Sequence, residues 1–205
     1  MRRLSCTTLT AAAVVVALSA PSSAADRNGA FDVRGLGSLP CSEINKTVEE
    51  KRQGDLVLVK TWLDGYFSAT NKYRSGVFDA LPWQSDQLVM NLVLSNCAEK
   101  PEIRIGQMAE ALLEFFESQR LAEKSPLVEA KVGEKTVTLY SAILRRAQEA
   151  LIKAGHLSGS ADGAFGPKTR AGFESFQEKT GLAKTGLPDQ ETLVRLFVDR
   201  QGNPG

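Results

Sequence analysis

The chain has 205 residues, and its 25 Lys and Arg residues against 24 Asp and Glu residues give a formal net charge of +1 at pH 7. Basic residues alternate with acidic ones along the sequence. Nucleic-acid binders use runs of Lys and Arg or rows of aromatic residues, and the sequence has neither. The composition therefore argues against nucleic acid as a partner.

Residues 1–25 have the pattern of a secretory signal peptide. Two arginines precede an apolar run that is too short to cross a bilayer, and a run of small residues follows at 22–25. We expect cleavage after residue 24 or 25, a periplasmic location and no stable membrane insertion afterwards. A retained N-terminal anchor is the alternative. About 180 residues would then remain, enough for two small domains.

The chain contains three cysteines and one histidine. Cleavage would remove Cys6 and leave Cys41 and Cys97 in an oxidising compartment, which predicts a single disulfide. Such a bridge would stabilise the fold by roughly 4 kcal/mol on the chain-entropy model. Two unpaired buried thiols are the alternative. Two cysteines and His156 do not make up a zinc site, so we predict neither a metal nor a cofactor.

Apolar spacing and capping residues predict a first, helical domain over residues 31–119. Helices are expected in a short stretch after Cys41, from about residue 56 to Tyr73, and over 105–116. Another is expected to start at Ser85 or Asp86 and to have Cys97 in its last turn. With the predicted bridge, this gives a small helical bundle held by one disulfide.

One pattern in this domain runs Trp62-x-x-Gly65-Tyr66-x-Ser68-Ala69-x-Asn71, followed by Cys97, Pro101 and a closing apolar helix. It resembles the small periplasmic acid-stress chaperones of the HdeA type. The resemblance implies a fold and leaves the function open. We expect Gly65 to let two helices approach closely.

Residues 120–137 are predicted to be a linker, because they mix Ser-Pro, Gly133 and several charges. Valines at 128, 132 and 137 are spaced as in a weak hairpin around Gly133-Glu134. Residues 199–205 are predicted to be a disordered tail.

Residues 138–198 predict three short helices joined by tight loops. The first helix has apolar residues at steps of three and four before Gly155. The second follows an Asp-Gly turn, with Gly166 as N-cap, Pro167 at the first helical position and Gly181 at its end. Asp189 can cap the last helix.

This unit resembles the peptidoglycan-binding domain family of bacterial cell-wall hydrolases. The matching positions, in order, are Gln148, Leu151, Gly155, Asp162, Gly163, Phe165, Gly166, Pro167, Thr169, Phe176, Gln177, Gly181, Leu182, Thr185, Gly186, Thr192 and Leu193. Ala147 and Gly172 depart from the family pattern, which usually has a larger apolar residue and an alanine there. A glycine inside a helix costs about 1 kcal/mol relative to alanine.

The resemblance implies that residues at the loop and its rim bind the ligand, which are Asp162, Gly163, Phe165, Lys168, Thr169, Arg170 and His156. Lys168, Arg170 and His156 offer donors to the carboxylates of wall peptides. A structural interpretation is also open. Folding alone would account for an Asp-Gly turn, a phenylalanine in the core and a threonine in the first turn of a helix. The amides of Gln148 and Gln177 would then tie loops to helices.

The sequence therefore predicts an all-α protein with an N-terminal one-disulfide helical bundle and a C-terminal three-helix peptidoglycan-binding domain. No pair of carboxylates, Cys/His pair or zinc set for wall hydrolysis is recognisable, so we expect no catalytic residues. The leading hypothesis is an exported, non-catalytic protein that binds peptidoglycan and holds the bundle at the wall. The alternatives are an acid-stress chaperone or partner of a periplasmic protein or cell-wall enzyme, tethered by the C-terminal domain, and a wall hydrolase.

Overall fold

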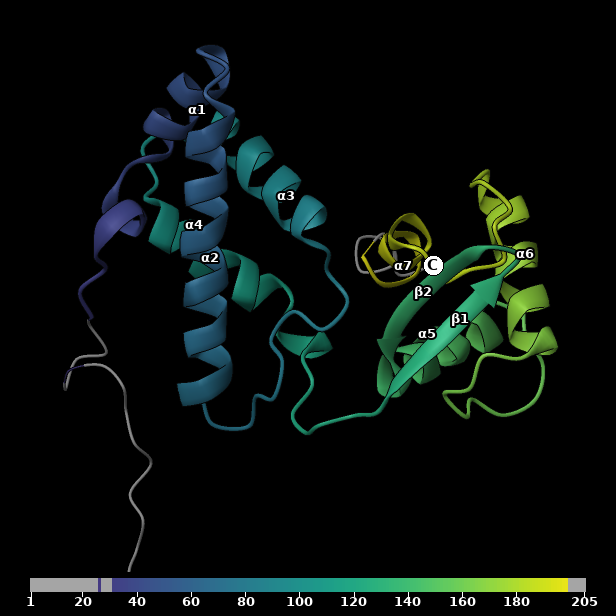
Figure 1. The fold of residues 1–205 in the computed structure, drawn as a ribbon. Coiled ribbons are helices and arrows are strands. Elements are labelled where there is room, and N and C mark those ends of the chain that lie inside the picture. The colour runs from purple at the N-terminus through teal and green to yellow at the C-terminus, as the bar shows by residue number, and fades with distance from the viewer. Residues whose placement is uncertain (1–25, 27–30, 199–205) are drawn as a thin grey trace, which may run out of the picture. The chain divides into compact units, whose positions relative to one another are not determined.

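The computed structural model describes residue 26 and residues 31–198 (Figure 1). The predicted signal peptide with its cleavage site, Cys6 and the predicted tail at 199–205 lie outside the described residues. The chain divides into two units, residues 1–31 and residues 32–205, and the described helices and strands belong to the second unit.

The first half of this unit consists of helices. They are η1 (Gly35–Ser38), α1 (Cys41–Glu49), α2 (Gln53–Tyr73), α3 (Asp86–Glu99), α4 (Ile105–Phe115) and η2 (Glu117–Gln119). Two predicted helix boundaries are confirmed: α2 stops at Tyr73, and the Ser85 hydroxyl caps α3 by accepting a hydrogen bond from the Leu88 N–H. Helix α2 begins at Gln53, earlier than expected. Helix α1 packs against both α2 and α3 (Figure 1).

The predicted disulfide is present and joins Cys41 to Cys97. Cys41 opens α1 and Cys97 lies in the last turn of α3, and both side chains are fully buried. The Asn45 side-chain amide adds a 2.9 Å hydrogen bond to the Cys97 carbonyl. The bridge thus closes a chain separation of 56 residues at a point where two helices already pack.

Gly65 does not mediate the close helix approach that the sequence suggested. It is exposed on α2, and a Cβ built there would meet nothing within 4 Å. The close approach occurs instead at Gly37 in η1, where a Cβ would lie 2.0 Å from the Trp62 ring. The Trp62 indole N–H donates to the Arg34 carbonyl at 3.0 Å, so the segment before α1 is fastened across α2.

A hairpin forms in the stretch that was expected to be a linker with a weak hairpin. Strand β1 (Leu127–Val132) pairs antiparallel with β2 (Lys135–Tyr140), with Val132 opposite Lys135. Gly133 has φ +61° in the turn, a value that glycine adopts readily. The fold is mainly helical, as predicted, with this two-stranded sheet added among the described residues.

Three helices follow the hairpin, as predicted: α5 (Ser141–Lys153), α6 (Pro167–Thr180) and α7 (Gln190–Phe197). Helix α5 packs against both α6 and α7. Gly166 is the N-cap of α6, and Gly181 closes it in the left-handed conformation at φ +72°. The Asp189 carboxylate caps α7 by accepting from the Thr192 N–H.

Residues of the α1–α4 part also contact the α5–α7 part. The Trp83 ring meets the Phe197 ring edge to face at 5.4 Å, and its indole N–H donates to Gln119. The Arg146 guanidinium donates to the carbonyls of Gln119 and Arg120 at 2.5 and 3.0 Å. Burial lowers the pKa of Arg146. The domain boundaries predicted from the sequence stay a prediction.

None of the described helices combines the length and the apolar character needed to cross a bilayer.

Candidate functional site

The loop between α5 and α6 is built around the buried side-chain amide of Gln148. Its Nε2 donates to the Asp162 carboxylate at 2.9 Å, the Ala164 carbonyl at 3.0 Å and the Thr169 hydroxyl at 3.0 Å. Its Oε1 accepts a 2.7 Å hydrogen bond from the Gly163 N–H. One glutamine on α5 therefore fixes the whole turn that leads into α6.

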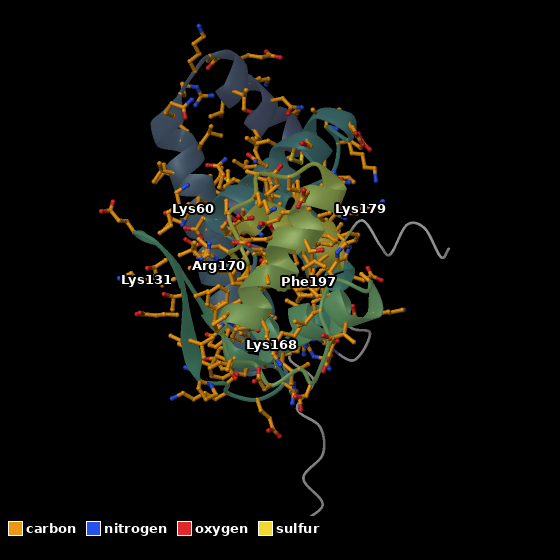
Figure 2. All side chains as sticks on the ribbon, turned by 90° about the vertical axis from the view of Figure 1, so that its right-hand side faces the viewer. Lys60, Lys131, Lys168, Arg170, Lys179 and Phe197 are labelled. Atoms are coloured by element: carbon orange, nitrogen blue, oxygen red, sulfur yellow. A yellow bond between two sulfur atoms is a disulfide. The ribbon has the colours of Figure 1, made fainter. Side chains whose placement is uncertain are left out.

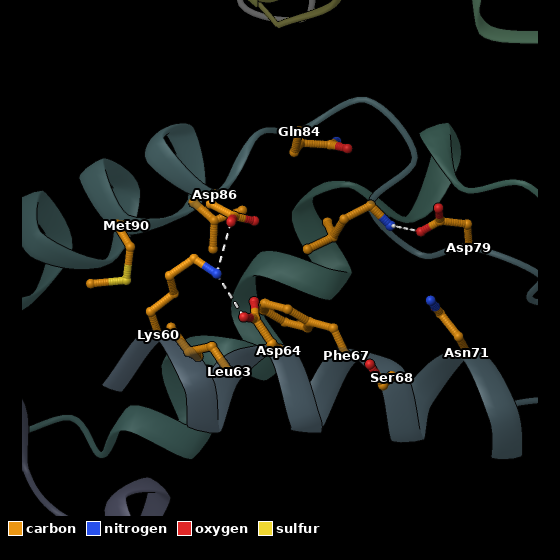
Figure 3. Close-up of a pocket in the computed structure, with 12 residues that line it drawn as sticks. Lys60, Leu63, Asp64, Phe67, Ser68, Asn71, Asp79, Gln84, Asp86 and Met90 are labelled. Atoms are coloured by element: carbon orange, nitrogen blue, oxygen red, sulfur yellow. Dashed lines mark hydrogen bonds and ion pairs between the residues drawn. The ribbon is translucent and has the colours of Figure 1, made fainter. Parts of the chain in front are cut away.

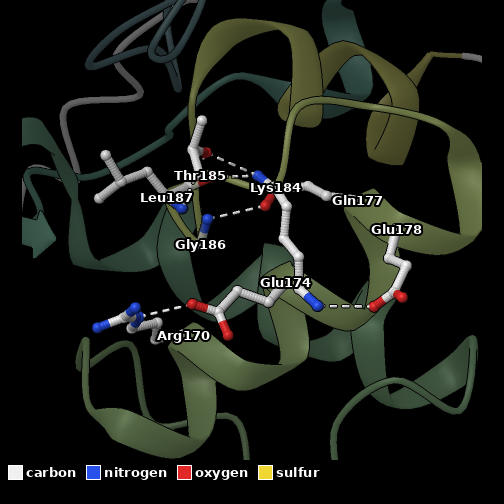
Figure 4. A network of polar contacts seen from close by, with 8 residues as sticks. All are labelled: Arg170, Glu174, Gln177, Glu178, Lys184, Thr185, Gly186 and Leu187. Carbon is white, nitrogen blue, oxygen red and sulfur yellow. Dashed lines mark hydrogen bonds and ion pairs between the residues drawn. The ribbon is translucent and has the colours of Figure 1, made fainter.

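The loop between α6 and α7 is built in the same way around Gln177, which is fully buried on α6 (Figure 4). Its Nε2 donates to the Thr185 hydroxyl, the Leu187 carbonyl and the Thr192 hydroxyl at 2.9 to 3.0 Å. Its Oε1 accepts from the Gly186 N–H at 2.8 Å. The expected tie between the two glutamines and their loops is thus confirmed.

The two loops are equivalent position by position. In each, the glutamine bonds the residue before a positive-φ glycine, the glycine N–H, the carbonyl of the next residue, and a threonine six residues after the glycine. That threonine is the third residue of the following helix in both cases. Each amide nitrogen thus has three acceptors within hydrogen-bond distance of its two N–H groups, and each amide oxygen accepts one backbone N–H.

Three of the predicted site residues are used inside the domain. The Asp162 carboxylate, the Gly163 N–H and the Thr169 hydroxyl all bond Gln148, and Thr169 is buried. Gly163 takes φ +73°, as the predicted turn requires. Phe165 is half-buried against the hydrophobic core. These contacts give the four residues a role in holding the loop.

The Asp162 carboxylate accepts hydrogen bonds from the loop and from α5. The Ala164 N–H donates to it at 2.9 Å, and the Gln148 amide does so as well. Both bonds favour the ionised form, so they lower the pKa of Asp162 below its ordinary value of 3.8, with the Ala164 bond as the larger cause. The carboxylate therefore stays ionised at neutral pH.

Arg170 extends from the first turns of α6 and is half-exposed, but it is not free. Its Nε donates to Glu174 at 2.7 Å, one helical turn further on (Figure 4). Its Cγ also lies close to where a Cβ on Gly186 would stand, at 3.0 Å. Arg170 thus covers the second loop while its outer face meets solvent.

Lys184 belongs to the same charged surface. Its Nζ lies 2.8 Å from Glu178, and the hydrogen bond to Glu178 is the largest cause that raises the pKa of Lys184, followed by the charges of Glu178 and Glu174. Charges therefore alternate on this surface through Arg170 and Glu174 of α6, Lys184 of the following loop, and Glu178 of α6. Lys184 and Arg170 are therefore electrostatically linked through Glu174.

Lys168 lies on α6, whereas His156 lies in the loop before α6 and contacts that helix at a different point. Lys168 is exposed in its first turn (Figure 2), next to the loop that Gln148 holds. The His156 Nδ1 lies 2.9 Å from the Ser175 hydroxyl, and its ring meets Phe176 edge to face at 5.5 Å. Lys168 and Arg170 therefore share the first turns of α6, whereas His156 contacts its middle.

Sequence reasoning did not single out Glu174 as a partner of Arg170, or Ser175 as a partner of His156. The spacing of four residues between Arg170 and Glu174 is a signal that could have found the first pair. No such signal exists for the second, because His156 and Ser175 lie on different elements.

The structure also gives a physical reason for a glycine at position 172 inside α6. A Cβ there would stand 3.2 Å from the Leu157 Cβ and 3.3 Å from the His156 carbonyl.

The cysteines, the histidine and the acidic side chains of the described residues have the following surroundings. Cys41 and Cys97 are consumed by the disulfide. Within residue 26 and residues 31–198, no three His, Cys, Asp or Glu side chains are grouped in a way that could hold a metal ion. The His156–Ser175 pair has no carboxylate that bonds and orients the ring in this part of the chain.

The family comparison matches residues 141–196 to the family described as "putative peptidoglycan binding domain". This range runs from the first residue of α5 to the penultimate residue of α7 and includes both glutamine-held loops. It confirms the family resemblance that the sequence motifs carried for the C-terminal part. The comparison with curated proteins and the comparison with solved structures found no match.

Proposed function

We propose that this protein is an exported, non-catalytic cell-wall protein, in which the α5–α7 domain binds peptidoglycan and holds the disulfide-bonded helices at the wall. The observation that carries the proposal is the family match over the three helices and their two loops. The disulfide is consistent with an extracytoplasmic location, because such bridges form and persist in oxidising compartments.

The first turns of α6 are the part of the domain best suited to meet the wall. Lys168 and Arg170 are exposed there, two residues apart in sequence, and Figure 2 labels both on the same helix. The residues behind them are fixed by Gln148, so the two cations stand on a rigid support. Wall peptides carry carboxylates, with which lysine and arginine form charge-assisted hydrogen bonds.

Co-sedimentation with purified sacculi tests this function on the full-length oxidised protein. We expect wild type to bind and the double variant Lys168→Ala/Arg170→Ala to bind at least about ten-fold more weakly, since a hydrogen bond to a charged group contributes roughly 1.5 to 3 kcal/mol. The melting temperature should barely change, because both side chains are at the surface. Incubation with the sacculi should release no soluble wall fragments.

Lys131→Ala is the matched control, because Lys131 is an exposed cation on the hairpin away from α6 (Figure 2). Lys184 would not serve as a control, because it shares a charged surface with Arg170 through Glu174 and Glu178. If wild type does not sediment with sacculi, peptidoglycan binding by this domain is refuted. If the control loses as much binding as the double variant, the α6 surface is not the contact.

Binding of a partner protein by the α1–α4 helices is the second candidate function. Val57 and Leu58 are adjacent on α2 and are 60% and 57% exposed, which leaves apolar surface on this helix uncovered. A chaperone or partner of a cell-wall enzyme would use such a surface. Replacing both residues by serine should then abolish capture of the partner while sacculus binding persists.

A further inference from the structure

A pocket of about 270 Å³ opens in the α1–α4 part, and its lining residues all come from this part (Figure 3). Helix α2 forms one wall, the segment from Asp79 to Gln84 another, and the first turns of α3 the third. Its lining combines apolar side chains such as Leu63, Phe67 and Met90 with charged and amide groups. The volume lies just below the range of pockets for drug-sized molecules, so it suits a small ligand.

The charged groups of the pocket are unbalanced. One lysine and three aspartates line it, which gives a formal charge of −2. At one end Lys60 places its ammonium 2.7 Å from both Asp64 and Asp86, so these carboxylates already share a cation (Figure 3). No ion pair among the described residues involves the third carboxylate, Asp79.

Asp79 is held in place by the segment around it. Its Oδ1 accepts a 3.1 Å hydrogen bond from the Leu81 N–H, and the Asn71 side chain of α2 accepts a 2.8 Å bond from the Ala80 N–H (Figure 3). Burial, the charge of Asp79 and a hydrogen bond from the Tyr140 hydroxyl to the Asp79 carboxylate raise the pKa of Tyr140, so this carboxylate accepts from two neutral donors and still carries its charge. The pocket is thus formed before a ligand arrives, with a carboxylate at one end.

We propose that this pocket binds the protonated amino group of an aliphatic primary amine, with the ammonium at Asp79 and the carbon chain over Phe67 and Leu81. A cation at Asp79 would offset the excess negative charge, as Lys60 does at the opposite end. The Phe67 ring and the aliphatic side chains would cover the apolar chain of the amine. An anionic ligand of the same size would meet net repulsion in the same pocket.

Two-dimensional NMR on the full-length oxidised protein tests the proposal, with pentylammonium as the probe at pH 7. Its neutral and anionic counterparts, pentan-1-ol and pentanoate, are matched in chain length. We expect pentylammonium to shift the Leu81 backbone and Asn71 side-chain amide resonances saturably, and the other two to bind at least about ten-fold more weakly. Equal binding of the alcohol, or no saturable shift with the amine, would overturn the assignment.

Asp79→Asn isolates the carboxylate, because asparagine keeps an oxygen that can accept from the Leu81 N–H. It should weaken pentylammonium binding about ten-fold, while Asp55→Asn, on α2 outside the pocket, should leave it unchanged. Unchanged binding to Asp79→Asn would also overturn the proposal.

A parallel titration with Nα-acetyl-lysine N-methylamide separates two sources of the ammonium. Tighter binding of this probe assigns a lysine side chain of a peptide, and tighter binding of pentylammonium assigns a free amine.

Discussion

The α-carbon of Gly163 lies directly against the Ser141 carbonyl at the start of α5. A Cβ built on Gly163 would stand 2.6 Å from that oxygen, and the glycine itself has φ +73°. The contact joins the α5–α6 loop to the first residue of α5 and leaves no space for a side chain on Gly163. The positive φ is a second restriction on the residue at this position. Both restrictions fall on a residue whose N–H is held by Gln148.

Replacing Gly163 by alanine should therefore destabilise the protein by two separate effects. The positive φ costs on the order of 1 kcal/mol, and the clash with a backbone oxygen adds to it, because the carbonyl cannot rotate away as a flexible side chain would. Gly155→Ala is the matched control, since Gly155 has φ +77° but open space around its Cβ position. Denaturant unfolding should show a larger loss for Gly163→Ala; equal losses would mean that the clash is relieved at no cost.

Gly65 and Gly172 are both helical glycines, and alanine should affect them differently. At Gly65 the Cβ meets nothing within 4 Å, so Gly65→Ala should raise the free energy of unfolding by up to about 1 kcal/mol through helix propensity. At Gly172 the contacts with Leu157 and the His156 carbonyl offset this gain, so Gly172→Ala should give no stabilisation. Equal stabilisation of both variants in thermal unfolding would contradict the packing at Gly172.

Gln177→Leu should be among the most destabilising substitutions of the α5–α7 domain. It removes the donated and accepted hydrogen bonds of a fully buried amide and leaves the Gly186 N–H without its acceptor. Buried groups left unpaired cost about 1 to 3 kcal/mol each, so we expect a loss of at least roughly 3 kcal/mol. Gln87→Leu, at an exposed glutamine bonded to Asn91, should cost little. A small effect of Gln177→Leu would show that water readily replaces the amide.

The depressed pKa of Asp162 predicts a loss of stability in acid. A carboxyl group whose pKa is lower in the folded than in the unfolded state contributes stability above its unfolded value, and that contribution is lost as the pH falls through the folded value. For Asp162 the loss begins below its ordinary value of 3.8. Asp162→Asn keeps an acceptor oxygen but does not titrate, so the variant should lose less stability than wild type on acidification.

Unfolding curves recorded from pH 6 to pH 2.5 measure this difference. Glu123→Gln is a suitable control, because it removes an exposed carboxylate outside the α5–α7 loops. The control should follow the wild-type dependence on pH. If Asp162→Asn follows it too, the hydrogen bonds from Ala164 and Gln148 do not favour the ionised form.

Much of the α5–α7 domain follows from short stretches of sequence. Gly166, Pro167 and Gly181 bracket α6, and Asp189 starts α7, because capping depends on the conformation and hydrogen bonds of a few neighbouring residues. The Asp-Gly turn is local in the same sense. The pairing of Cys41 with Cys97 also followed from the sequence, since the predicted export leaves only these two cysteines in the chain.

Only the tertiary structure determined which groups each side chain bonds or contacts. Asp162 and Thr169 are both bonded by Gln148, which is distant in sequence, and Arg170 is bonded by Glu174 on its own helix. Gly65 proved exposed and Gly37 proved to be the point of close contact, because which face of α2 is covered depends on the path of a separate segment. Local patterns determined where the helices begin and end, whereas long-range contacts determined which polar groups are already paired and which remain for a ligand.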